Sequence, residues 1–253
     1  MDEEKRKKAR KTADRLRSKY EGLNRPLEWF EELYKEADGD PELIPWGGRV
    51  KEGGHAKEDG SEQGTDLWAH GQARFPLIEW LQLPGSQKWQ ASSTHPKTAL
   101  DVGCGLGANA IALYEAGYQV TAFDISETAV KWAASQAPEL SIDWTCQNLL
   151  DMPKEWEGKF DLVSETFTIQ ALYGAERLAA IEALTKLVAP KGKLLIICRG
   201  RRDDTIPDTP PLPLSPAELD KIETFGFTST LRREYFDNKA EPNLHFLAEY
   251  TKT

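Results

Sequence analysis

The stretch TALDVGCGLGANAIALYEAGYQVTAFDIS, residues 98–126, contains the order of elements that decides the fold. A short apolar run is followed by three glycines at alternate positions, a helical pattern, a second apolar run and an acid, Asp124. Apolar residues at helical spacing over 110–114 predict a helix, which Gly117 ends. Strand, glycine turn, helix, strand and acid in this order predict the first unit of a nucleotide-binding α/β domain.

Each part of this stretch suits the binding of a nucleotide. Glycine adopts positive φ and carries no Cβ, so a ligand can approach the backbone closely at Gly103, Gly105 and Gly107. A helix that begins directly after them points its free N–H groups toward the same place. At the tip of the second strand, the carboxylate of Asp124 can accept hydrogen bonds from ribose hydroxyls.

The spacing of the glycines bears on which nucleotide binds. Dinucleotide sites carry G-x-G-x-x-G, whereas this chain has G-x-G-x-G preceded by Asp101. The run L-D-V-G-C-G-L-G, residues 100–107, resembles the first motif of the class I S-adenosylmethionine-dependent methyltransferases. In that family the loop holds the methionine end of the cofactor rather than a pyrophosphate. A glycine turn in another Rossmann-like domain is the alternative interpretation.

The resemblance implies a cofactor site that extends beyond the glycine loop. Members of the family carry a polar residue, usually Asp, with an apolar neighbour after the third strand, where they contact adenine. Asn148 matches this position, and its carbonyl oxygen can accept a hydrogen bond from an amine; a polar turn residue is the alternative. The implied cofactor-binding residues are Asp101, Gly103, Cys104, Gly105, Gly107, Asn109, Asp124, Ile125, Asn148, Leu149, Leu150 and Glu165.

A second segment that matches the family is F-D-L-V, residues 160–163, at the position of the fourth strand. The carboxyl end of that strand faces the transferable methyl group in this fold, so Glu165 is the predicted catalytic residue, as a general base. A carboxylate that binds the cofactor or supports the structure is the alternative. The segment is most similar to thiopurine S-methyltransferases and a bacterial group of small-molecule methyltransferases, although Thr166 stands where the thiopurine enzymes have Arg.

These patterns predict an α/β fold with a Rossmann-like, doubly wound sheet of seven strands, the last antiparallel, and an N-terminal helical cap. We expect a cap or lid over residues 1–97, with helices at 1–22, 25–37 and 66–83, a mobile loop at 47–64 and a polar linker at 85–97. Residues 98–253 form the predicted cofactor-binding core. Its second half has helices at 177–188 and 215–225 and ends in two strands, at 227–236 and 244–250. Tryptophans before the core either anchor the helices or line a lid: Trp29, Trp46, Trp68, Trp80 and Trp89.

Composition excludes several classes of function. The formal net charge of −9 argues against a general nucleic-acid binder, which needs a basic face to neutralise phosphates. We expect no membrane association, because no run of 18 apolar residues exists, and a cytoplasmic location, because the N-terminus lacks a secretory pattern. The three cysteines are interpreted as small buried residues. The four histidines lack metal-ligand spacing, so no metal is expected.

We therefore predict S-adenosylmethionine-dependent methyl transfer to a small-molecule acceptor, with a thiol as one candidate. Methyl transfer needs the nucleophile and the methyl group to be close, aligned and shielded from water. A thiol hardly needs a base, whereas a hydroxyl does. Two alternatives stay open, a nicotinamide-dependent oxidoreductase and a methyltransferase-like binding protein without turnover. The oligomeric state is not predicted.

Overall fold

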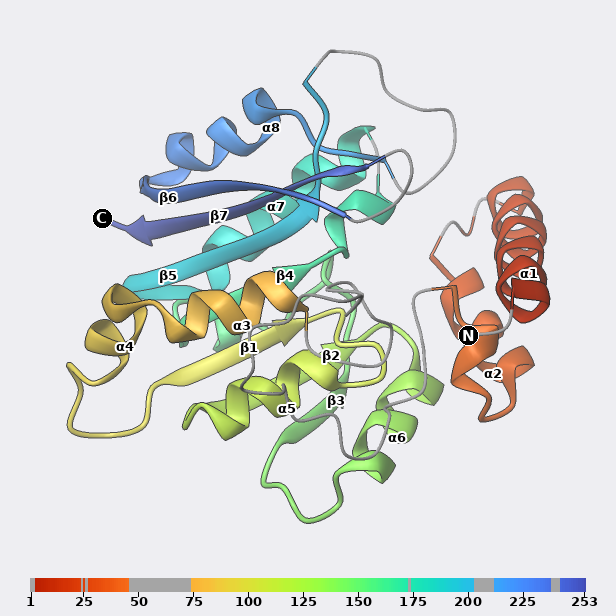
Figure 1. Cartoon of the computed structure of the whole chain (residues 1–253), viewed down its shortest axis with the longest axis horizontal. Helices are drawn as coiled ribbons and strands as arrows, with labels where there is room; N and C mark the ends of the chain where they lie inside the picture. Colours follow the sequence, from red (N-terminus) through yellow and green to blue (C-terminus); the bar gives the residue numbers. More distant parts are fainter. Residues whose placement is uncertain are drawn as a thin grey trace, which may run out of the picture.

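The computed structural model describes residues 3–23, 25, 27–45, 74–172, 174–202, 212–237 and 242–253. Within them, seven strands form one sheet in the order β3-β2-β1-β4-β5-β7-β6, with helices on both faces (Figure 1). The strands are β1 (Thr98–Val102), β2 (Gln119–Asp124), β3 (Asp143–Cys146), β4 (Phe160–Thr166), β5 (Val188–Arg199), β6 (Phe227–Phe236) and β7 (Leu244–Lys252). The structure confirms the predicted Rossmann-like, doubly wound class.

The helices surround this sheet. The α-helices are α1 (Glu3–Gly22), α2 (Trp29–Ala37), α3 (Phe75–Gln82), α4 (Pro84–Gln90), α5 (Ala108–Glu115), α6 (Glu127–Gln136), α7 (Gly174–Leu187) and α8 (Pro216–Asp220). Short 3₁₀ helices are η1 (Pro41–Leu43), η2 (Lys154–Trp156), η3 (Ile169–Ala171) and η4 (Lys221–Phe225).

Strand direction sets where a ligand can bind. β1 runs parallel to β2 and β4, and β4 runs parallel to β5. β7 is antiparallel to both β5 and β6, as predicted for the last strand. The order reverses at β1, because β2 lies on one side of it and β4 on the other. In open α/β sheets, ligands bind at such a switch point, outside the carboxyl ends of the strands.

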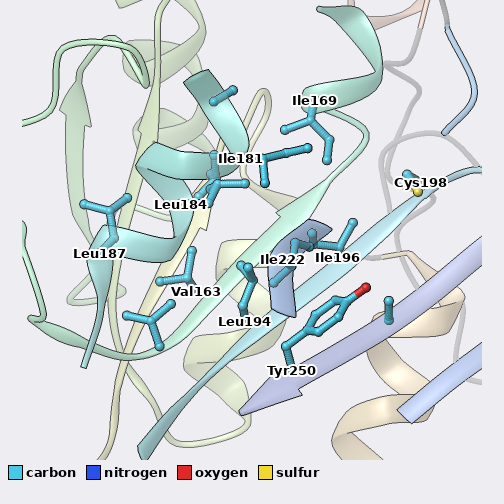
Figure 2. Packing of buried hydrophobic residues seen from close by; sticks show 14 of the residues in the cluster. Val163, Ile169, Ile181, Leu184, Leu187, Leu194, Ile196, Cys198, Ile222 and Tyr250 are labelled. Atoms are coloured by element: carbon cyan, nitrogen blue, oxygen red, sulfur yellow. The ribbon is translucent and has the colours of Figure 1, made fainter. Parts of the chain in front are cut away.

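Two apolar layers hold the sheet between the helices. On one face, α7, α8 and η4 pack against β4, β5 and β7, and Figure 2 shows Ile181 and Leu184 meeting Val163 and Leu194 there. On the other face, α3 and α5 cover the sheet, with fully buried Trp80 among their contacts. Helices on both faces leave these strands buried on both sides, which explains their nearly continuous apolar sequences.

The N-terminal helices form a third apolar cluster, which lies at the carboxyl-end side of the sheet (Figure 1). Leu16 of α1 and Leu33 and Tyr34 of α2 are fully buried in it. Ala129 of α6 belongs to the same cluster, and Leu106 of the glycine loop packs against it. The N-terminal helices therefore contact the segments that carry the cofactor motif.

Some predicted boundaries were wrong. The predicted linker at 85–97 contains α4, which Pro84 begins as a favourable first-turn residue. The helix predicted at 66–83 is described only from Phe75 onward, where it forms α3. Residues 66–73 and the loop predicted at 47–64 lie outside the described residues. The division into a cap and a core at residue 97 stays a prediction.

Among the tryptophans, Trp29 and Trp80 are buried anchors, as the simpler interpretation predicted. Trp89 packs partly against the sheet beside Lys97 and Lys193. Trp46 and Trp68 lie outside the part of the chain that the structure describes.

Candidate functional site

The candidate site lies where β1 and β4 end side by side. Val102 is paired with Glu165 in the parallel ladder, and Asp101 is paired with Ser164. The glycine loop follows β1 directly, and α5 begins at its end. The structure thus brings the predicted first motif and the predicted fourth-strand acid to adjacent positions at the carboxyl edge.

The three loop glycines all have positive φ, but their neighbours differ. A Cβ at Gly103 would collide with the side chain of Thr168, whose hydroxyl donates to the carbonyl of Val102. A Cβ at Gly107 would lie 2.6 Å from the indole ring of Trp144. Sequence reasoning assigned both glycines to the cofactor, whereas the structure gives each a packing reason as well.

Asp124 holds the glycine loop from the end of β2. One carboxylate oxygen accepts from the N–H of Gly105 at 2.9 Å, and the other accepts from the N–H of Ser126 at 2.9 Å. Burial raises the pKa of Asp124, and the backbone hydrogen bonds oppose that shift. The predicted ribose-binding acid therefore also fixes the loop beside it.

A residue that sequence reasoning missed, Glu31 of α2, extends this network. Its carboxylate accepts from Ser126 Oγ at 2.6 Å, from Thr128 N–H at 3.1 Å and from Thr128 Oγ1 at 2.8 Å. Burial disfavours the charge of Glu31, but these hydrogen bonds outweigh burial and lower its pKa. Because Glu31 and Ser126 are 95 positions apart, no local sequence signal indicated the contact.

Two buried carboxyl groups, Asp101 and Glu165, lie at the ends of β1 and β4. Asp101 accepts from the backbone of Ala110, and Glu165 Oε1 accepts from the N–H groups of Thr168 at 2.5 Å and Ile169 at 3.0 Å. Among the described residues, Asp101 Oδ2 and Glu165 Oε2 are buried without a hydrogen-bond partner.

The environment of these carboxyls favours a positively charged ligand. Burial raises the pKa of Asp101 to about 8, and the charges of Asp124 and Glu165 raise it further. Burial also raises the pKa of Glu165 to about 7, which hydrogen bonds from Ile169 and Thr168 oppose. Unpartnered carboxyl oxygens in an apolar surrounding are costly, and a cation beside them would offset that cost.

The other predicted cofactor residues border the same edge, and several of them already make hydrogen bonds within the protein. Asn109, in the first turn of α5, accepts from the backbone N–H of Arg74 at 3.0 Å, which ties the start of α3 to the glycine loop. The carbonyl of Ile125 lies 3.4 Å from the thiol of Cys146. Cys104 is partly buried, and burial raises the pKa of its thiol well above the ordinary value.

Asn148 closes a turn after β3. Its side-chain oxygen accepts from the N–H of Leu150 at 3.0 Å, and its backbone carbonyl accepts from Asp151. Asn148 therefore acts as a polar turn residue, which is the alternative interpretation given above. The NH₂ group of its side chain takes no part in the hydrogen bond with Leu150. Leu149 is buried, and Leu150 packs against the core.

The two arginines after β5 pair with glutamates on other elements. Arg201 pairs with Glu218 at 3.0 Å, and Arg202 pairs with Glu234. The Arg201 pair joins the segment after β5 to α8.

The comparisons with known proteins agree with this geometry. Residues 99–192 match a family described as a methyltransferase domain. Over these residues the chain is similar to a methyltransferase domain. The match agrees with the predicted methyltransferase family and with S-adenosylmethionine as its cofactor, whereas the thiopurine-like subgroup is not confirmed.

Curated relatives of this methyltransferase domain include a protein named ubiquinone biosynthesis O-methyltransferase from Xanthomonas campestris pv. campestris. It is 35% identical over 104 residues, which are 40% of this chain and 43% of the relative. A protein of the same name from Xanthomonas oryzae pv. oryzae is 34% identical over the same shares. The chain thus matches less than half the length of these relatives.

Solved structures show the same fold. The 1,6-didemethyltoxoflavin-N1-methyltransferase of Burkholderia thailandensis, solved with S-adenosylhomocysteine, has a TM-score of 0.55 at 18% identity, covering 67% of this chain and 77% of its own. The magnesium protoporphyrin IX methyltransferase of Synechocystis has a TM-score of 0.54 at 20% identity, covering 74% and 91%. In the part of the chain that the structure describes, no helix is long and apolar enough to span a membrane. No group of three or more candidate metal ligands lies there either, and the absence of a metal stays a prediction.

Proposed function

We propose that this chain binds S-adenosylmethionine and transfers its methyl group to a hydroxyl oxygen of a small-molecule acceptor. The observation that carries the proposal is the pair of buried carboxyls, Asp101 and Glu165, each of which has one oxygen without a partner among the described residues. They lie beside a glycine loop and a helix start, at the switch point of the sheet. A ligand with cationic groups fits this set of donors and acceptors.

We assign a part of the cofactor to each segment. Asp124 and the segment at Ile125 would hold the ribose, and Leu149 would contact the adenine ring. The glycine loop with Asp101 would hold the methionine end, where Glu165 Oε2 is the second candidate partner for a cation. When bound, the cofactor supplies a methyl group that its sulfonium charge has already activated. The protein's task is then to orient the acceptor and to exclude water.

The proposal also names the acceptor atom, which is a more specific claim than the cofactor. The relatives named above are O-methyltransferases by their names, which favours a hydroxyl. The earlier prediction of a thiol acceptor has no support of its own, and the oxidoreductase alternative has none from the comparisons. The general-base role predicted for Glu165 stays a prediction, since one of its oxygens is held by two backbone N–H groups.

The test is calorimetric titration with S-adenosylmethionine, S-adenosylhomocysteine and NAD in parallel. We expect the first two to bind and NAD to give no heat of binding. Asp124→Asn should weaken S-adenosylhomocysteine by at least tenfold, because a charged acceptor of ribose hydroxyls contributes about 1.5–3 kcal/mol per hydrogen bond. Asp143→Asn, an exposed position on β3, is the matched control. Binding of NAD alone would contradict the proposal.

A further inference from the structure

The carboxylate of Asp124, at the end of β2, is held by backbone groups on both sides. Gly105 N–H donates to its Oδ2 at 2.9 Å, and Ser126 N–H donates to its Oδ1 at 2.9 Å. Each oxygen of an ionised carboxylate can accept two hydrogen bonds, so a ribose hydroxyl can bind beside an N–H group. The glycine loop and the segment after β2, which carry the two N–H groups, therefore set the orientation of Asp124.

Glu31 of α2 holds the segment after β2. Its Oε2 accepts from Ser126 Oγ at 2.6 Å and from Thr128 N–H at 3.1 Å, and its Oε1 accepts from Thr128 Oγ1 at 2.8 Å. Ser126 is fully buried, and its hydroxyl oxygen also accepts from the N–H of Ala129 at 3.0 Å. A chain of hydrogen bonds therefore runs from Glu31 through Ser126 to Asp124.

These contacts fix the first turn of α6. Ser126 is the N-cap residue of α6, and Thr128 N–H is one of the groups that a helix start leaves without an intrahelical partner. Glu31 supplies that partner from another element, and its negative charge is favourable at a helix N-terminus. Because Ser126 belongs to this turn, a movement of the turn also moves the N–H that donates to Asp124.

The N-terminal helices contact the glycine loop as well. Leu106 of this loop packs against the apolar cluster that contains Leu33 and Tyr34 of α2. Figure 1 shows α2 beside α6, and Ala129 of α6 belongs to the same cluster. The same helices thus contact both segments that orient Asp124, the glycine loop by packing and the start of α6 by hydrogen bonds as well.

Stability alone does not explain the carboxylate of Glu31. Leu16, Leu33 and Tyr34 are each 1% exposed, so apolar burial already docks the N-terminal helices. Burial disfavours the charge of Glu31, and hydrogen bonds that replace those to water contribute little net stability. Charge-assisted hydrogen bonds add a defined direction to such packing.

We propose that Glu31 is a positioning residue for the cofactor, and that it orients the carboxylate of Asp124 toward the ribose through Ser126. The inference rests on the proposed function, in which Asp124 would hold the ribose. Glu31 itself does not touch the cofactor in this assignment. The N-terminal helices then raise cofactor affinity by fixing the geometry of the ribose site.

The first experiment is a double-mutant cycle on the full chain, with S-adenosylhomocysteine affinity measured by calorimetry. We expect Glu31→Ala to weaken binding at least tenfold in the wild-type background. In the Asp124→Asn background the same change should weaken binding less than threefold, because the residue through which Glu31 acts is already altered. Glu32→Ala is the matched control, since this neighbouring acid of α2 pairs with Lys35 of the same helix. It should change the affinity less than twofold.

A second measurement separates positioning from a loss of structure. The affinity for S-adenosylhomocysteine is compared with that for an analogue that lacks both ribose hydroxyls, in the wild type and in Glu31→Ala. The wild type should prefer S-adenosylhomocysteine at least tenfold, and Glu31→Ala should reduce this preference to less than threefold. A general loss of structure would weaken both ligands alike and leave their ratio unchanged.

Hydrogen exchange of the wild-type chain needs no variant, so this measurement holds even if Glu31→Ala does not fold. Coupling between two sites is reciprocal, so cofactor binding should also strengthen the contacts of Glu31. Saturating S-adenosylhomocysteine should slow the exchange of the Thr128 amide, which donates to Glu31, at least tenfold. Amides of β6, at the opposite edge of the sheet, should change less than twofold. Unchanged exchange at Thr128 would contradict the inference.

The outcomes separate this inference from the proposed function. If S-adenosylhomocysteine binds but Glu31→Ala weakens it equally in both backgrounds, or not at all, Glu31 joins α2 to the core without positioning Asp124. An unchanged ratio of the two ligand affinities leads to the same conclusion. If the wild-type chain does not bind S-adenosylhomocysteine, the proposed function itself is overturned.

Discussion

Binding of S-adenosylmethionine should release a proton from the buried carboxyls at the carboxyl edge. Burial raises the pKa of Asp101 to about 8 and that of Glu165 to about 7. At pH 7, groups with these pKa values are roughly 90% and 50% protonated. A cationic ligand favours the ionised form of both, so binding that ionises both fully should displace about 1.4 protons.

The assay is calorimetry at pH 7 in buffers that differ in their ionisation enthalpy, because the slope of the observed heat against that enthalpy counts the protons. Asp101→Asn should reduce the release to about half a proton, the share that Glu165 keeps at pH 7. At pH 9 the wild type should release almost none, because both groups are already ionised. Asp143→Asn, exposed on β3, should match the wild type. Zero release by the wild type at pH 7, or equal release by Asp101→Asn, would refute the reasoning.

Three further predictions concern the stability of the fold. Without cofactor, the raised pKa of Asp101 means that the folded chain holds a proton that the unfolded chain loses, so the melting temperature should fall as pH rises from about 4 to about 8, and less so in Asp101→Asn. Gly107→Ala places a Cβ 2.6 Å from Trp144 at a φ of 85°, which should cost about 1–3 kcal/mol of unfolding free energy in urea titrations. Glu249→Ala leaves the ammonium of Lys193 without its 2.5 Å partner and should cost about 3–5 kcal/mol, seen as a lower melting temperature; a change under 1 kcal/mol would mean that the pair is not buried in solution.

The candidate site was predictable where its signals are local. The apolar runs and alternate glycines of residues 98–126 indicated β1, α5, β2 and the acid at its end, because these elements depend on neighbours a few residues away. Helix boundaries outside the core were less predictable: the polar sequence of residues 85–97 predicts a linker, whereas the structure has α4 there, beginning at Pro84. The partners of Arg201 and Arg202 were missed because they lie on distant elements.

The sequence by itself determined the kind of domain and the place of the cofactor motif, because strand, glycine turn and helix are encoded by local periodicity and by the positive φ that glycine allows. Only the tertiary structure decided which residues meet at the carboxyl edge. Strand order brings Val102 beside Glu165, and the fold brings Glu31 to Ser126 and Phe167 to His245. Such contacts depend on packing between elements far apart in the chain, for which a single sequence carries no periodic signal.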